Sequence, residues 1–202
     1  MRWFCDEFAA MEMQVGKTSG MDSYDLMVLA ASRVGPGCEE LVMLPHLQGA
    51  MAPEANPKAS GVFYGFTLRH GRSHFTRAIM EAVSFIVRRN NEVIEGLGVS
   101  VTDVRALGGG GRSRIWKQME ADIIGRPVLT TTNEEAATLG TAILAGKAVG
   151  LYSSVEEAAE RMIQIKERFE PASVNRAIYD ETCGTYIKLY DAVCPLFETR
   201  QA

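Results

Sequence analysis

Apolar residues follow two different spacings along the chain, and together these spacings predict a domain built from helices and strands. The longest helical period covers residues 73–97, where apolar side chains recur on one face. Short apolar runs bounded by turn residues predict buried strands at 41–44, 61–67, 104–107 and 128–130. Because predicted strands alternate with helices, the sequence predicts an α/β fold.

The remaining predicted helices are marked by capping residues at their starts. Thr132 with Glu135, and Ser153 with Glu156, have the spacing of capping boxes. Residues 48–60 are mostly small, contain two prolines and predict a long loop. The helices predicted beside the longest one cover residues 1–8, 22–32, 113–124, 132–148, 153–165 and 174–197. So few strands for so many helices suggest that part of the sheet is supplied from elsewhere.

Four consecutive glycines join the strand predicted at 104–107 to the helix that starts near Ser113. Glycine lets a ligand approach the backbone without a Cβ in the way, and a helix start offers unpaired N–H groups. The arrangement predicts either a nucleotide cradle or a tight connection. Ser113 stands where a Rossmann fingerprint needs glycine, and Arg112 stands where a Walker A loop continues with Gly-Lys. A cradle without that lysine favours contacts to adenine, ribose or outer phosphates.

Composition narrows the class of protein. The chain has 202 residues, 47% of them hydrophobic, which fits a single domain over 1–202, or one large domain with an appendage, and a sizeable core. Its net charge is −4 and its basic residues are scattered, so we expect neither nucleic acid nor a membrane surface as a partner. No segment has the pattern of a membrane helix or signal peptide, which predicts a cytoplasmic protein. The four cysteines are widely spaced, which predicts buried free thiols.

Seven ordered segments, which span most of the chain, follow one recognisable pattern: Leu44–Gly49, Pro57–Gly61, Gly65–His70, Arg77–Glu81, Gly109–Gln118, Asp122–Val128 and Glu134–Ala142. They resemble the C-terminal domain of the FGGY carbohydrate kinases, and most closely that of xylulokinases. Glycerol kinase, gluconokinase and fuculokinase remain alternatives within the family. Gly111 stands where the family commonly has alanine.

The resemblance implies an actin-like, ribonuclease-H-like fold with a small mixed sheet flanked by helices, lacking its first strands. It implies that Gly109, Gly110 and Gly111 line the adenine pocket, with Ser113 and Arg114 at the following helix start. It also implies ATP with Mg²⁺ as cofactors and a sugar held mainly by an N-terminal domain.

The aspartate base and the phosphate loops that the family needs have no counterpart in this sequence, so the chain resembles a fragment. We assign no catalytic residue here. The aspartates, Asp122 among them, are interpreted as caps or solvated charges. Glu134 and Glu135 fit a helix's first turn, and His70 and His74 lack a third metal ligand.

Two functions follow from these observations. The first is the ATP-binding half of a sugar kinase acting on a ketopentose such as xylulose, inactive alone. The second is a truncated, non-catalytic nucleotide-binding or subunit-interaction module. The oligomeric state stays open, a homo-oligomer included.

Overall fold

The computed structural model describes residues 1–107, 113–133 and 135–199. Three helices open the chain: α1 (Arg2–Phe8), α2 (Ala10–Ser19) and α3 (Ser23–Ala31). Asp22 caps α3 as expected, because its side chain accepts a 2.8 Å hydrogen bond from the Tyr24 N–H. Helix α2 is not predicted from the sequence, because it buries only Gly16 and therefore shows no apolar face.

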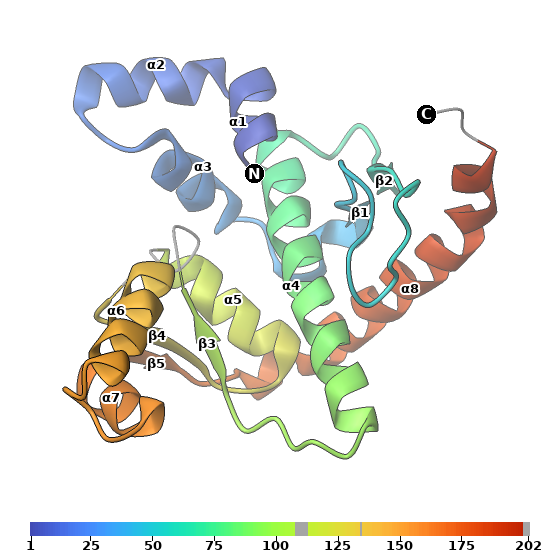
Figure 1. The fold of residues 1–202 in the computed structure, drawn as a ribbon. Helices are drawn as coiled ribbons and strands as arrows, with labels where there is room; N and C mark the ends of the chain where they lie inside the picture. The colour runs from blue at the N-terminus through green and yellow to red at the C-terminus, as the bar shows by residue number, and fades with distance from the viewer. Residues whose placement is uncertain (108–112, 134, 200–202) are drawn as a thin grey trace.

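A short antiparallel strand pair follows, made of β1 (Val42–Leu44) and β2 (Val62–Tyr64). The turn η1 (Pro36–Glu40) leads into β1, and the predicted loop connects the two strands. β1 lies beside α4 (Arg72–Gly96) and α8 (Arg176–Glu198), as Figure 1 shows. All three residues of β1 are buried, because two apolar cores meet on its two faces.

Helix α4 is the central element of the fold and matches the predicted 73–97 helix to within one residue at each end. Its first half is buried almost all round, including Arg77 and Glu81, because α1 and α3 cover one side and α8 covers another. Its second half is amphipathic, with Val93 and Ile94 exposed.

A three-stranded mixed sheet fills the other side of the molecule (Figure 1). Its order is β3 (Val104–Ala106), β4 (Val128–Thr131) and β5 (Ile165–Phe169). β3 and β4 are parallel, with Val104 opposite Val128, and β5 runs antiparallel to β4. The α/β fold with a small mixed sheet flanked by helices is therefore confirmed.

Helices cover both faces of this sheet. α5 (Arg114–Ile124) connects β3 to β4 and packs its Ala121 and Ile124 against Val128. The opposite face meets α6 (Ala136–Ala148), and α7 (Val155–Met162) leads on to β5. The turn η3 (Ser173–Asn175) then begins the path to α8, whose tyrosines enter the main core.

Three local predictions are wrong in instructive ways. Residue 165 starts β5 rather than ending a helix, because its segment pairs with β4 while exposing most of its side chains. The Thr132 capping box does not form: α6 begins after Glu135, and the Thr132 N–H bonds Gln164 at the end of the strand ladder. The cap of α7 is Ser154, one residue later than predicted.

Candidate functional site: the turn between β3 and α5

The predicted site lies at the carboxyl end of the parallel strand pair β3–β4. β3 ends at Ala106 and α5 begins at Arg114, so the predicted strand precedes the glycines and the predicted helix follows them. Gly109, Gly110 and Gly111, with Arg112 and Glu134, lie outside the described residues. Parallel strands in α/β folds present their carboxyl ends to ligands, which makes this edge a suitable place for a nucleotide.

Ser113 is the residue that starts α5. Its backbone is extended, with φ −81° and ψ 108°, and its Oγ accepts a 3.3 Å hydrogen bond from the Trp116 N–H. The Ser113 carbonyl accepts the Lys117 N–H at 3.0 Å, which begins the helical ladder. Ser113 is thus a helix N-cap. The other N–H groups of this first turn lie at the positive end of the helix dipole.

Arg114 points from the first turn of α5 toward β5. Its guanidinium forms an ion pair with Glu167 and lies 5.6 Å from the centre of the Phe169 ring. The arginine side chain is 71% exposed, so the pair is only a weak restraint. Arg114 would have to exchange Glu167 for a phosphate in order to bind one. In its present position it offers a flat, partly neutralised group beside the turn.

A small apolar cavity lies under α6 at the same end of the sheet. Its volume is about 130 Å³, which is below the range typical of ligand pockets. Leu107, the residue directly before the glycines, lies in its wall. The cavity alone is therefore too small for a nucleotide. Its other lining residues are Arg105, Thr131, Asn133, Ala136, Leu139, Gly140, Ile143 and Ile163.

Asp122 fixes the far end of α5. The prediction that its carboxylate is a solvated or capping charge is wrong. It is only 5% exposed, and its carboxylate accepts hydrogen bonds from three donors. These donors are the Gln118 side chain at 2.8 Å, the Ala172 N–H at 2.8 Å and the Asn175 side chain at 2.7 Å. Gln118 also donates to the Glu170 carbonyl at 2.7 Å. The sequence marks Gln118 and Asp122 only through the family resemblance.

The remaining candidate groups have structural partners. His70 and His74 both accept backbone N–H groups at Nδ1, from Thr67 at 2.8 Å and Gly71 at 3.1 Å. Over the described ranges no group of three or more His, Cys, Asp or Glu could hold a metal ion. Trp116 packs against the main core.

The cysteines are free, and three of the four are buried. Burial raises the pKa of the Cys38 thiol to about 12, and Cys38 donates to the His74 carbonyl at 3.0 Å.

None of the helices in the described part is long and apolar enough to span a bilayer.

Solved structures identify the class of this fold. The crystal structure of xylulose kinase from Rhodospirillum rubrum superimposes with a TM-score of 0.78 at 28% identity, covering 93% of this chain and 37% of that one. The domain is therefore an actin-like ATPase domain of the sugar-kinase type. Residues 1–149 match the model of the FGGY family of carbohydrate kinases, C-terminal domain, and the chain belongs to that family.

Curated relatives agree with this assignment. Gluconokinase from Bacillus licheniformis is 34% identical over 197 residues, covering 96% of this chain and 38% of its own length. Xylulose kinase from Bacillus subtilis is 31% identical over 188 residues, covering 93% and 36% respectively. The chain thus spans less than two-fifths of the length of these relatives, and the two relatives carry different sugar names.

Proposed function

We propose that this chain is the ATP-binding half of a carbohydrate kinase that transfers the γ-phosphate of ATP to a sugar hydroxyl. The observation that supports this most directly is the order β3, glycine turn, α5 at the carboxyl edge of a parallel strand pair, in a chain of the FGGY family. We place the enzyme in the cytoplasm and the sugar mainly in an N-terminal domain. A single domain over 1–202 would then supply the nucleotide contacts.

The nucleotide site that we propose consists of Gly109, Gly110, Gly111, Ser113 and Arg114. The glycines would let the base and ribose approach the backbone, and the N-terminus of α5 would face the negative charge. Mg²⁺ would enter bound to the phosphates of ATP and would neutralise charge there. Arg114, paired with Glu167, would contact the base side of the nucleotide rather than clamp the γ-phosphate.

The experiment that tests this site is calorimetric titration of the chain with ATP and ADP in the presence of Mg²⁺. We expect Gly110→Val to abolish binding, because the added side chain would occupy the space of the nucleotide. Gly35→Val is the matched control: Gly35 has an extended backbone, with φ −68°, and an added Cβ would meet nothing within 4 Å. If Gly110→Val binds ATP as well as the unaltered chain does, the glycine turn is not the nucleotide site.

The sugar that we propose is xylulose, with xylulose 5-phosphate as the product. The curated relatives include gluconokinases at equal similarity, so the sequence segments of the resemblance are the main support. We expect the chain alone to release no sugar-dependent ADP, since we find no catalytic base in it. Turnover by the chain alone would place a base within these residues.

The alternative function is a non-catalytic nucleotide-binding or subunit-interaction module, a homo-oligomer included. Restoring an N-terminal kinase domain distinguishes the two. Sugar-dependent ADP release that appears only with both parts supports the kinase half. ATP binding without turnover in the combined protein supports the module.

A further inference from the structure

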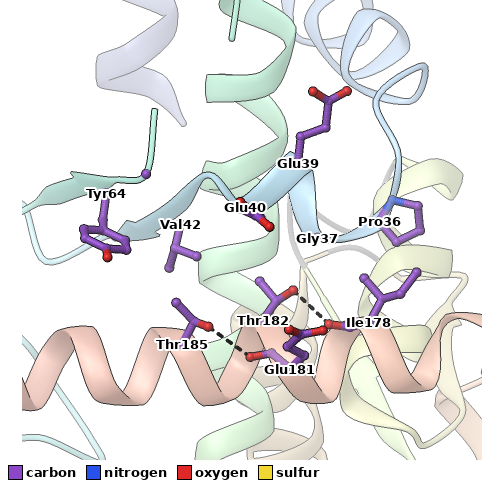
Figure 2. A pocket seen from close by; sticks show the side chains of 11 residues that line it. Pro36, Gly37, Glu39, Glu40, Val42, Tyr64, Ile178, Glu181, Thr182 and Thr185 are labelled. Atoms are coloured by element: carbon purple, nitrogen blue, oxygen red, sulfur yellow. Dashed lines mark hydrogen bonds between the residues drawn. The ribbon is translucent and has the colours of Figure 1, made fainter. Parts of the chain in front are cut away.

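A cavity of about 430 Å³ lies between the turn η1 and helix α8, beside the β1–β2 pair (Figure 2). Its volume is within the range of small-molecule sites. Pro36, Gly37 and Glu40 of η1 form one wall, while Thr182 and Thr185 of α8 form the facing wall. The other lining residues are Glu39, Val42, Tyr64, Gly65, Ile178 and Glu181. The nucleotide site proposed above uses none of them.

The wall formed by η1 has an unusual backbone that its neighbours hold in place. Gly37, Cys38, Glu39 and Glu40 all have left-handed conformations, with φ of 75°, 51°, 52° and 73°. The Gly37 N–H donates to the buried Glu81 carboxylate at 3.2 Å, and Cys38 is tied to α4 by its thiol. The wall is therefore formed before any ligand binds, which lowers the entropy lost on binding.

The wall formed by α8 can only accept hydrogen bonds. The Thr182 hydroxyl donates to the Ile178 carbonyl at 2.8 Å, and the Thr185 hydroxyl donates to the Glu181 carbonyl at 3.2 Å. Each hydroxyl has thereby used its one hydrogen, and only its oxygen lone pairs remain. Figure 2 shows both threonines directed from α8 toward the turn, with their hydrogen bonds drawn.

Carboxylates extend this surface of acceptors. Figure 2 shows Glu40 directed from the turn toward α8, whereas the Glu39 carboxylate points away from α8 and lies 3.7 Å from His74. Among the described residues that line the cavity there is no Lys, Arg or His. The Tyr64 hydroxyl can donate one hydrogen bond, but the carboxylates and the two threonine hydroxyls need hydrogens from a ligand, and they would repel a phosphate or carboxylate group placed against them.

Two kinds of ligand carry enough hydrogens to donate to these acceptors, a small cation and a polyol. The apolar surface of the cavity favours the polyol. Val42 and Tyr64 are register partners and therefore share one face of the β1–β2 pair, from which the tyrosine ring borders the cavity. With Pro36 and Ile178 they give the cavity surfaces that suit the C–H faces of a carbon chain. A small cation would leave these apolar surfaces uncovered, and its ion pairs with the exposed Glu40 and Glu181 would be weak. A polyol covers the apolar surfaces with its carbon chain while its hydroxyls donate to the carboxylates.

We propose that the cavity between η1 and α8 binds a neutral polyhydroxylated molecule, an unphosphorylated sugar or sugar alcohol, and rejects its anionic counterparts. The proposal goes beyond the nucleotide site and is independent of it. The donor hydroxyls of the ligand face Glu40, Glu181 and Thr185, and its carbon chain lies along Tyr64.

The test uses two probes that differ at one carbon, D-glucitol and D-gluconate. We expect D-glucitol to shift the ¹⁵N amide resonances of Gly65 and Thr185 with a Kd on the order of 1–10 mM, a range usual for weak ligands. D-gluconate should bind at least about tenfold more weakly, since its carboxylate faces the carboxylates of the wall.

Two variants and one control locate the binding. Glu181→Gln replaces an ionised acceptor and should weaken D-glucitol binding by about fivefold, and Thr185→Val should do so by a similar factor. Glu160→Gln, an exposed carboxylate of α7, makes the same charge change elsewhere and should change nothing. ATP binding should be equal in all of these variants, so failure here is distinguishable from failure of the nucleotide site.

Three results would overturn the proposal. One is the absence of D-glucitol shifts at these residues, and another is equal binding of D-gluconate. The third is tighter binding of the diamine putrescine than of D-glucitol, which would make the cavity a cation site.

Discussion

Arg77 is the side chain whose removal tests the structure most directly. It lies in the buried half of α4, with its side chain 7% exposed, and its guanidinium donates three hydrogen bonds. It donates to Glu81 at 2.7 Å, to the Val34 carbonyl at 2.7 Å and to the Tyr179 hydroxyl at 2.8 Å. The guanidinium thereby joins α4 to the segment that follows α3 and to α8. Arg77→Met keeps most of the side-chain volume and removes the charge.

The expected loss is large because Glu81 would stay behind, buried and without its cation. Its side chain is only 2% exposed, and breaking a buried pair from one side costs about 3–5 kcal/mol. That is a substantial part of the roughly 5–15 kcal/mol by which a domain is stable. Arg88→Met in the same helix is the matched control. The carboxylates that Arg88 contacts, Glu92 and Asp180, are about half exposed, so we expect a loss of about 1 kcal/mol.

The loss should also depend on pH with a defined sign. Burial raises the pKa of Glu81 to about 7, although Arg77 opposes the shift. When the pKa of a carboxyl is higher in the folded chain than in the unfolded chain, the group stabilises the fold at pH values below the unfolded pKa. This stability is lost as the pH rises through the folded pKa. Without Arg77 the folded pKa rises further. The difference between Arg77→Met and the unaltered chain should therefore be largest at pH 8 and shrink toward pH 5.

Urea unfolding followed by circular dichroism measures both effects, because the midpoint moves with the free energy of unfolding when the slope is constant. The double variant Arg77→Met/Glu81→Gln should recover more than half of the loss at pH 8, since it leaves no buried charge. The reasoning is refuted if Arg77→Met costs no more than Arg88→Met, or if adding Glu81→Gln recovers nothing.

Two further variants test other buried groups. Burial lowers the pKa of His46, so protonation favours the unfolded chain and stability from this group falls as the pH drops below about 6.5. The unfolding free energy of His46→Gln minus that of the unaltered chain should therefore increase as the pH is lowered from 7 to 5.5. A difference that stays constant over this range would contradict the prediction. Asp122→Ala leaves three donors without their acceptor and should lower the free energy of unfolding by about 3 kcal/mol. A loss under 1 kcal/mol in urea unfolding would show that water replaces the carboxylate.

The sequence predicts those elements whose burial is one-sided or complete. The long helix α4 and the helix α5 have regular apolar spacing, and their ends fall within one residue of the prediction. All residues of β1 and β4 are buried, and accordingly β1 is an uninterrupted apolar run and β4 begins with the apolar pair Val128 and Leu129. In each case the spacing of apolar residues in the sequence follows from which faces of the element are buried.

The elements that the sequence does not predict are those with little burial. α2 buries one glycine, and β5 is an edge strand with a single fully buried side chain, Phe169. Neither leaves a periodic apolar pattern. β5 exists because β4 offers it a free edge, and this partner is distant in the sequence. The Thr132 capping box fails for the same reason, since the ladder to Gln164 takes the backbone group that a cap would need.

For the candidate site, sequence reasoning gives the residue types but not their partners. The strand before the glycines and the helix that starts at Ser113 are as expected, whereas the cap that Ser113 forms is not predicted from the sequence. The contact of Arg114 with Glu167 and Phe169 depends on β5, which the sequence does not predict. Asp122 shows the same limit, because its donors lie four, 50 and 53 residues away along the chain.

These distant contacts bear on how the proposed nucleotide site would work. A helix N-terminus binds an anion well only when the helix is held still, because mobile dipoles must be ordered on binding. α5 is held at its far end by the hydrogen bonds of Asp122, on one side by α4, and on another by β4. At the carboxyl end of α5, Gly125 caps the helix with a left-handed backbone of φ 70°. The whole helix, including its Ser113 end, is thus held in place. On this reasoning a change at Asp122 that leaves the chain folded should still weaken nucleotide binding, through the position of α5 rather than through contact.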